Sequence, residues 1–279
     1  MDCQERELLN FLVYGYFGYT YDELENMYSA NADEVIRCCA ERAYLDFNRT
    51  LTYLKKDGQE MPSHERENVR SFREKFYGIE KGAGSGSDCD VKMIERIKGL
   101  LATDNQEAFD KLHRELCTQI RDYANQSDLL LPDKYTGSKF HYGQAQKWVN
   151  MTLKYMMLLG FWKELRTDSS PSVRQFLHVP VDSYILKIAA SRPGTKTAAI
   201  REYWLNVNAP RKDGEPDNVY SADHTLPWSR WNAEHYESFL SSLDSGLNPW
   251  CKSHPNAARI DWEGPAWIAQ AKLERERKT

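Results

Sequence analysis

The sequence lacks the features that would place it in a membrane, in an oxidising compartment or around a metal cluster. None of its apolar runs approaches the ~18 residues that span a bilayer. Its first ten residues, MDCQERELLN, have no basic segment followed by an apolar one, which a secretory signal requires. Its six cysteines include no CxxC pair, which disfavours a zinc or iron–sulfur site. We therefore expect a cytoplasmic protein with reduced thiols, no metal, no cofactor and no membrane partner.

The chain also carries little excess charge of either sign. Its 37 basic and 41 acidic residues give a net charge of −4, whereas proteins that bind nucleic acids are usually basic. The balance is uneven along the chain, because residues 134–201 contain eleven basic and three acidic residues. A basic patch matters more than the sum of charges, so the net acidity argues only mildly against a nucleic-acid partner.

No segment alternates apolar and polar residues convincingly, and no repeat is visible. Apolar residues instead recur at helical spacing, and prolines separate the later segments. We expect an all-α protein with helices over 5–14, 21–29, 32–56, 63–78, 90–102, 105–124, 146–159, 183–192, 197–205, 229–243 and 264–276. Asn31 or Asp33 is expected to cap the helix that starts near residue 32.

The best candidate for a linker is the glycine- and serine-rich segment 82–87. It predicts an N-terminal helical region over residues 1–81 and a second helical region over 88–279.

The segment Gly143–Asn150, GQAQKWVN, is typical of a tight turn that opens a helix. Gly143 is expected to adopt a left-handed conformation, and the N–H groups that follow it would suit a phosphate. Lys147 then lies in the first helical turn. There the helix dipole disfavours an ammonium group, which would lower the pKa of Lys147 and make its amine a better nucleophile.

The segment Val179–Arg192, VPVDSYILKIAASR, places Asp182 directly before an apolar helix and two residues after a proline. This is the position of an N-cap, where a carboxylate accepts hydrogen bonds from the first backbone N–H groups. Lys147 and Asp182 thus lie at the beginnings of two helices. An amine and a carboxylate that converge in this way suit chemistry at a sugar carbon, because positive charge develops there when an N-glycosidic bond breaks.

These two segments resemble the helix-hairpin-helix DNA glycosylases, the endonuclease III-like superfamily. The hairpin pattern of that family, G-x-G-x-K, aligns with Gly143, Ala145 and Lys147, with alanine in place of the second glycine. Its V-P-V-D-T-H stretch aligns with Val179–Tyr184, with serine and tyrosine in the last two positions. The resemblance covers about residues 137–206, and the first 130 residues match no family that we can name.

The resemblance implies a multi-helix fold with a helix-hairpin-helix and a cleft between two helical subdomains. The hairpin would span about residues 137–160, the helix that bears the aspartate 182–192, and the C-terminal helices 197–276. Lys147 and Asp182 are 35 residues apart, which is more than is usual in the family and implies an insertion over 161–178.

The resemblance also implies the roles of the site residues. Asp182 would be the essential carboxylate, and Lys147 the nucleophile of members that also nick the strand. Four aromatic residues near the two motifs are candidates for a pocket that holds an extruded base: Trp148, Tyr184, Tyr142 and Phe140. Seven residues are candidates for contact with double-stranded DNA: Gly143, Gln144, Ala145, Gln146, Lys139, Lys187 and Arg192.

The function expected from this resemblance is excision of a modified or damaged base from DNA, leaving an abasic site. A divergent bacterial member that removes hypermodified cytosine from phage DNA, in antiviral defence, is one form of it. Two other classes stay open on the residues alone. One is a helical module that binds DNA without chemistry, and the other is a helical protein that binds another protein.

Overall fold

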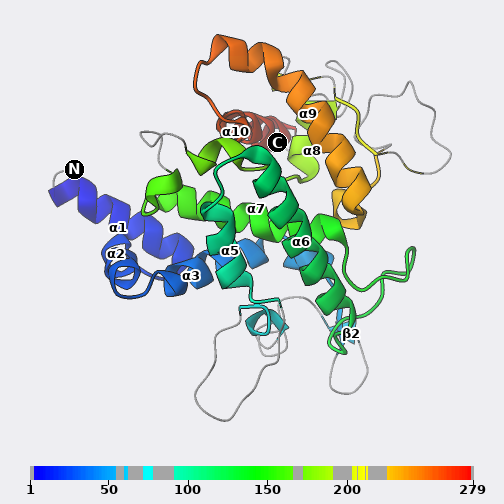
Figure 1. Cartoon of the computed structure of the whole chain (residues 1–279), viewed down its shortest axis with the longest axis horizontal. Coiled ribbons are helices and arrows are strands. Elements are labelled where there is room, and N and C mark those ends of the chain that lie inside the picture. The colour runs from blue at the N-terminus through cyan, green and yellow to red at the C-terminus, as the bar shows by residue number, and fades with distance from the viewer. Residues whose placement is uncertain are drawn as a thin grey trace. The chain divides into compact units, whose positions relative to one another are not determined.

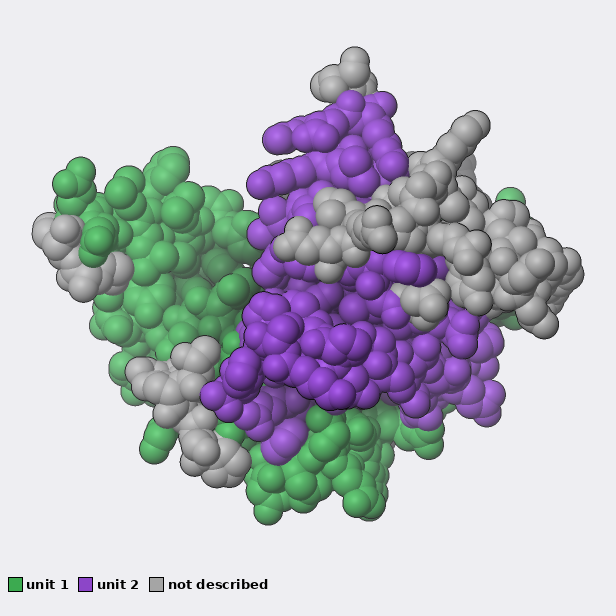
Figure 2. Space-filling view, turned by 90° about the horizontal axis from the view of Figure 1, so that it is seen from above, with its two compact units in different colours: residues 1–140, 148–174 green, residues 141–147, 175–279 purple. Residues whose placement is uncertain are grey.

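The computed structural model consists almost entirely of α-helices joined by irregular segments, so the predicted all-α class is confirmed (Figure 1). The structure describes residues 3–54, 60–61, 72–77, 91–165, 172–190, 203–205, 207–210, 212 and 225–277. Its chain divides into two compact units, which Figure 2 colours separately. Unit 1 comprises residues 1–140 and 148–174, and unit 2 comprises residues 141–147 and 175–279.

Unit 1 contains the helices α1 (Cys3–Phe17), α2 (Tyr21–Ala30), α3 (Ala32–Leu45), α5 (Met93–Leu101) and α6 (Gln106–Asn125). The helix α7 (Tyr142–Leu159) gives residues 142–147 to unit 2 and the rest to unit 1. Unit 1 also contains a short antiparallel pair, β1 (Tyr53–Leu54) and β2 (Glu60–Met61).

Unit 2 is built mainly from α8 (Ser183–Ala190), α9 (Ala233–Ser253) and α10 (Arg259–Glu276). α10 packs against both α8 and α9. Among the described residues, 3-10 turns lie at Asn48–Thr50 (η1), Lys163–Leu165 (η2), Val173–Phe176 (η3) and Trp228–Arg230 (η6).

Side-chain caps fix where several helices begin. The Thr20 hydroxyl and the Glu23 carboxylate form a reciprocal capping box at the start of α2. Asn31 accepts the backbone N–H of Asp33 and caps α3, as the sequence predicts. Asn105 and Asn232 cap α6 and α9 in the same way.

The core of unit 1 is an aromatic cluster centred on Trp148. Its indole ring lies 5.1–6.2 Å from the rings of Tyr44, Phe47, Phe76 and Tyr77, mostly edge to face. The indole N–H donates to the carbonyl oxygen of Ala40 at 2.8 Å, so the one polar atom of this side chain is satisfied inside the core.

The helix predicted over 32–56 is too long, because α3 ends at Leu45. The chain continues through η1 into β1, where Tyr53 bridges Leu130 and the N–H of Leu54 donates to the carbonyl of Leu129. Phe47 and Leu51 are still buried, as their helical spacing suggested. Pairing with a distant segment therefore decides the backbone here, while the apolar side chains keep their place in the core.

Two prolines predicted to separate helices instead lie inside them, Pro249 in α9 and Pro265 in α10. Helix 229–243 was therefore predicted to end too early and helix 264–276 to begin too late. In α10, burial of Trp262 and Ala266 on the two sides of Pro265 outweighs one lost backbone hydrogen bond. The linker at 82–87 and most of the helices predicted over 63–78 and 197–205 lie outside the described residues. In the part of the chain that is described, no helix is both long enough and apolar enough to cross a membrane.

We predict that Trp148→Phe lowers the free energy of unfolding by about 2 kcal/mol, because it opens a cavity and leaves the carbonyl of Ala40 without its donor. Urea unfolding measured by circular dichroism tests this. Trp250→Phe is the control, because Trp250 is partly exposed on α9 and its replacement should cost well below 1 kcal/mol. Equal losses for the two variants would contradict the packing role of Trp148.

Candidate functional site

Hydrogen bonds within unit 2 fix the conformation of the first turn of α7. The N–H of His141 donates to the side chain of Gln144 at 2.7 Å, and the carbonyl of His141 accepts from the N–H groups of Gln144 and Ala145. The side-chain amide of Gln146 donates to the carbonyl of Gly143 and, at 3.3 Å, to that of Val181. These contacts fix the backbone that carries Lys147.

The expected left-handed turn at Gly143 is wrong, because α7 begins at Tyr142 and Gly143 has no positive φ. Its N–H donates to the carbonyl of Trp231 at 2.9 Å. A Cβ atom placed on Gly143 would lie 1.8 Å from the carbonyl oxygen of Trp228. Glycine is therefore needed here for the close approach of the 228–231 backbone, and not for an unusual conformation of its own.

The four hairpin residues predicted to contact phosphate, Gly143, Gln144, Ala145 and Gln146, are all buried. Their backbone or side-chain donors are used within unit 2, as described above. A phosphate would find neither exposed surface nor the N–H of Gly143 at this helix start. The N-terminus of α7 thus positions Lys147 and gives no support to a phosphate clamp.

Asp182 caps α8, as the sequence predicts. Its Oδ1 atom accepts the backbone N–H groups of Tyr184 and Ile185, both at 3.0 Å. The preceding residues Val179, Pro180 and Val181 are buried, so the cap is set on a fixed segment. The other carboxylate oxygen, Oδ2, is directed away from the backbone of α8 and is available to side chains.

Lys147 and Asp182, which are 35 residues apart, meet in unit 2. The ammonium nitrogen of Lys147 lies 3.0 Å from Oδ2 of Asp182. The lysine side chain is only 5% exposed and that of Asp182 is 18% exposed, so solvent reaches the carboxylate more readily than the amine. A pair this buried is strongly coupled, because little water screens it.

A third side chain, that of Trp267 on α10, completes the site. Its indole N–H donates to Oδ2 of Asp182 at 3.0 Å. Its ring packs edge to face against Tyr184, with the ring centroids 5.2 Å apart. Both aromatic side chains are partly exposed. Sequence reasoning missed Trp267, since no local motif marks a tryptophan 85 residues beyond the aspartate it contacts.

The surroundings of Asp182 keep it ionised. Burial acts to raise the pKa of the carboxyl, but the Lys147 ammonium, the N–H of Ile185 and the indole of Trp267 outweigh that effect and hold the pKa below its usual range. The carboxylate accepts four hydrogen bonds in all, two on each oxygen. It is therefore a fixed anion at neutral pH and a poor proton acceptor.

The remaining predicted site residues lie in different surroundings. Trp148 and Phe140 are fully buried in unit 1, and Tyr142 is buried in unit 2 with its ring near that of Tyr236. Tyr184 is the predicted pocket residue that keeps both exposed surface and a place beside Asp182. The structure therefore gives Trp148 and Phe140 a packing role and leaves no face of either ring for a base.

The predicted DNA contacts outside the hairpin are Lys139, Lys187 and Arg192. The ammonium of Lys187 pairs with Glu274 of α10 at 2.6 Å. The ammonium of Lys139, in unit 1, donates to the carbonyl of Ser127 at 2.7 Å. Arg192 lies outside the described residues. Both described lysines are thus engaged within the protein, and a phosphate would have to compete with those partners.

Among the described residues, no group of three or more histidine, cysteine, aspartate or glutamate side chains could hold a metal ion. A depression of about 460 Å³ on unit 1 is lined by Lys92, Glu95, Arg96, Gly99 and Leu112. None of these residues belongs to the Lys147–Asp182 site. The helix-hairpin-helix arrangement and a cleft that admits a base therefore stay predictions.

We predict strong coupling between Lys147 and Asp182 in a double-mutant cycle. Lys147→Gln and Asp182→Asn should each lower the free energy of unfolding by about 3 kcal/mol, because each leaves one charge nearly buried without its partner. The double variant should lose at least 1 kcal/mol less than the sum, since it leaves no unpaired charge. Urea unfolding of the four proteins at neutral pH measures this, and additive losses would mean that the pair is not coupled.

We predict that the indole N–H of Trp267 reports the titration of Asp182. Its ¹⁵N–¹H resonance, assigned with Trp267→Phe, should shift with a midpoint below the ordinary aspartate pKa of about 3.9. Because the pKa of Asp182 is lowered in the folded state, its contribution to stability is present above that ordinary pKa. It is lost as the pH falls through the folded pKa. Asp182→Asn is the control and should remove this titration, whereas a midpoint at or above 3.9 would refute the described surroundings.

Known proteins do not assign a role to this site. No family model matches the chain, and neither a curated protein nor a solved structure matches it. Any function must therefore be argued from the site itself and from the residues that resemble the glycosylase motifs.

Proposed function

We propose that this protein is a DNA glycosylase that excises a modified or damaged base and leaves an abasic site. The observation that carries the proposal is the contact of 3.0 Å between Lys147 and Asp182. These are the two residues that the glycosylase motifs single out, and they come from separate helices of unit 2. The aromatic rings of Tyr184 and Trp267 beside the carboxylate add support, because an extruded base stacks on such faces.

In this mechanism Asp182 acts through its charge. Departure of the base takes the electron pair of the N-glycosidic bond and leaves positive charge on the sugar. A carboxylate that is ionised and held by four N–H donors stabilises that charge without having to reorient. Water then adds to the sugar carbon, the proton that it loses is balanced by one that the departed base takes up from solvent, and the products are free base and an abasic site.

Lys147 has a supporting role in the hydrolytic route. Its ammonium keeps Asp182 ionised and in place, and its 5% exposure limits direct access to a sugar. In the alternative route the neutral amine attacks the sugar carbon, expels the base and forms a Schiff base, which permits strand cleavage by β-elimination. That route requires Lys147 to lose a proton and leave Asp182. We therefore propose hydrolysis as the main route.

The proposed partner is double-stranded DNA that carries a modified base. Hypermodified cytosine in phage DNA is one candidate substrate, which would give the protein a role in antiviral defence. The base would be extruded from the duplex and placed against the partly exposed faces of Tyr184 and Trp267. These two rings would then influence which base is accepted.

A second candidate function is a helical module that holds DNA or a protein without chemistry. It is favoured by the burial of the Lys147 side chain, because a nearly buried ion pair also serves as a bridge between two helices. The net charge of −4 fits a protein partner better than DNA. A gel shift at two salt concentrations separates these cases. A module that binds DNA retards it, and less so at the higher salt concentration, whereas a module that binds only protein does not retard DNA at either concentration.

We predict that the protein releases bases from duplex DNA and that Asp182→Asn reduces the rate at least ~100-fold, because a transition-state charge loses its counter-ion. The assay incubates the protein with a panel of duplexes with modified bases and with phage DNA, and then cleaves abasic sites with hot alkali. Borohydride should trap no covalent complex if the route is hydrolytic.

The double variant Lys147→Gln with Asp182→Asn is the matched control for this assay. Its loss of stability should be smaller than the sum of the two single losses and it should still be inactive, and a native circular dichroism spectrum of both variants separates lost chemistry from lost folding. Full activity of Asp182→Asn would overturn the site assignment. Release of no base from any duplex of a broad panel would overturn the proposed function.

A further inference from the structure

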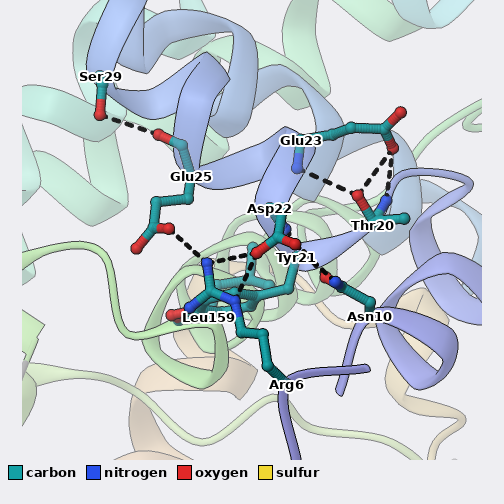
Figure 3. Close-up of polar contacts among 9 residues, drawn as sticks. All are labelled: Arg6, Asn10, Thr20, Tyr21, Asp22, Glu23, Glu25, Ser29 and Leu159. Carbon is teal, nitrogen blue, oxygen red and sulfur yellow. Dashed lines mark hydrogen bonds and ion pairs between the residues drawn. The ribbon is translucent and has the colours of Figure 1, made fainter. Parts of the chain in front are cut away.

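The helix α1 differs from an ordinary surface helix, because polar side chains help to hold it against unit 1 while several large apolar ones are exposed. Two of its polar side chains, those of Arg6 and Asn10, are directed to α2, and Arg6 forms ion pairs with Asp22 and Glu25 there (Figure 3). Asn10 and Asp22 exchange two hydrogen bonds, of 2.7 and 3.1 Å. A surface helix normally packs its apolar side inward and leaves such polar groups to water.

The opposite face of α1 is apolar and exposed. Leu8, Phe11 and Leu12 follow helical spacing and are 60%, 76% and 66% exposed. Residues 8–20 contain no charged side chain, although 28% of the whole chain is charged. Six of the ten large hydrophobic side chains that are strongly exposed in the described residues lie between positions 8 and 19. A concentration of this kind marks an interaction surface.

Gly15 lies on the same face, one turn beyond Phe11 and Leu12. A glycine inside an exposed helix lowers its stability relative to alanine, and no described atom outside the adjoining backbone of α1 lies within 4 Å of where its Cβ would be. The fold of a single chain therefore gives no reason for glycine at this position. A close approach by another molecule would give one.

We propose that a second copy of this chain covers the face, with its α1 packed antiparallel to the first across a two-fold axis. An axis between Phe11 and Leu12 places Phe11 of each copy opposite Leu12 of the other. It also places Leu8 opposite Gly15 of the other copy, so that a large side chain meets an open space. The face formed by residues 8–15 is thus complementary to itself, as a two-fold interface requires, and no charge within these residues is buried by the pairing.

The size of the face predicts a weak dimer. The exposed side chains that share it, those of Leu8, Phe11 and Leu12, each offer roughly 100 Å², or roughly 300 Å² per copy. Stable complexes typically bury about 800 Å² per partner, so we expect dissociation in the upper part of the micromolar range. The pairing uses residues of unit 1 only, so it does not depend on the function proposed for the Lys147–Asp182 site.

The test measures the mass of the full chain by sedimentation equilibrium at protein concentrations from roughly 1 µM to roughly 100 µM. This range covers the dissociation constants of the weaker complexes with interfaces of this size. The wild type should dimerise, and Leu12→Glu should raise the dissociation constant at least ~10-fold. Leu158→Glu is the matched control, because Leu158 is a leucine with 65% exposure on another helix, and it should leave the dimer unchanged. A wild type that is monomeric throughout, or a dimer that Leu12→Glu leaves intact, overturns the proposal.

A second pair of variants tests the pairing of Leu8 with Gly15. Gly15→Leu should weaken the dimer, because Leu8 of the partner loses the space it fills. Combining it with Leu8→Gly exchanges the two residues and should restore the dissociation constant to within ~3-fold of the wild type. A non-specific sticky surface makes the opposite prediction, because an added leucine would strengthen association. Stronger association of Gly15→Leu therefore also overturns the proposal.

Discussion

The ion pair between Lys147 and Asp182 is the interaction on which the described site of unit 2 depends. It joins the second turn of α7, and not the first turn that the sequence predicted for Lys147, to the N-cap of α8, and both partners are largely removed from water. A buried charge is tolerated only where its hydrogen bonds are complete, and Asp182 meets that condition with two backbone and two side-chain donors. The close packing of Gly143 on the 228–231 backbone and the bond from Gln146 to Val181 hold the two helix starts in the required positions.

Sequence reasoning predicted the local features of this site and missed those that depend on distant segments. The proline before Asp182 and the apolar run after it define an N-cap, and the structure has that cap. Gly143 was misjudged because its role is set by a backbone segment some 85 residues later, which no local pattern reveals. Trp267 was missed for the same reason, and the burial of Trp148 follows from aromatic partners scattered across unit 1.

The two units expose different chemical groups to other molecules. In unit 2 the partly exposed groups at the site are a carboxylate and two aromatic rings, which suit a planar and electron-poor ligand. In unit 1 large apolar side chains of α1 are exposed, while Arg6 and Asn10 hold α1 against α2. The helical pattern of α1 could be recognised from sequence, but the direction of its faces could not, because that depends on Asp22 and Glu25.

The two carboxylate oxygens of Asp182 have different hydrogen-bond partners, and this affects any reaction at the site. Oδ1 is tied to the backbone of α8 and Oδ2 to two side chains, so rotation of the carboxylate would break bonds at both ends. The orientational freedom of this group is lost when unit 2 folds, long before a ligand arrives. A preorganised anion needs almost no reorganisation in the transition state, which is the condition under which a single charge lowers a barrier most effectively.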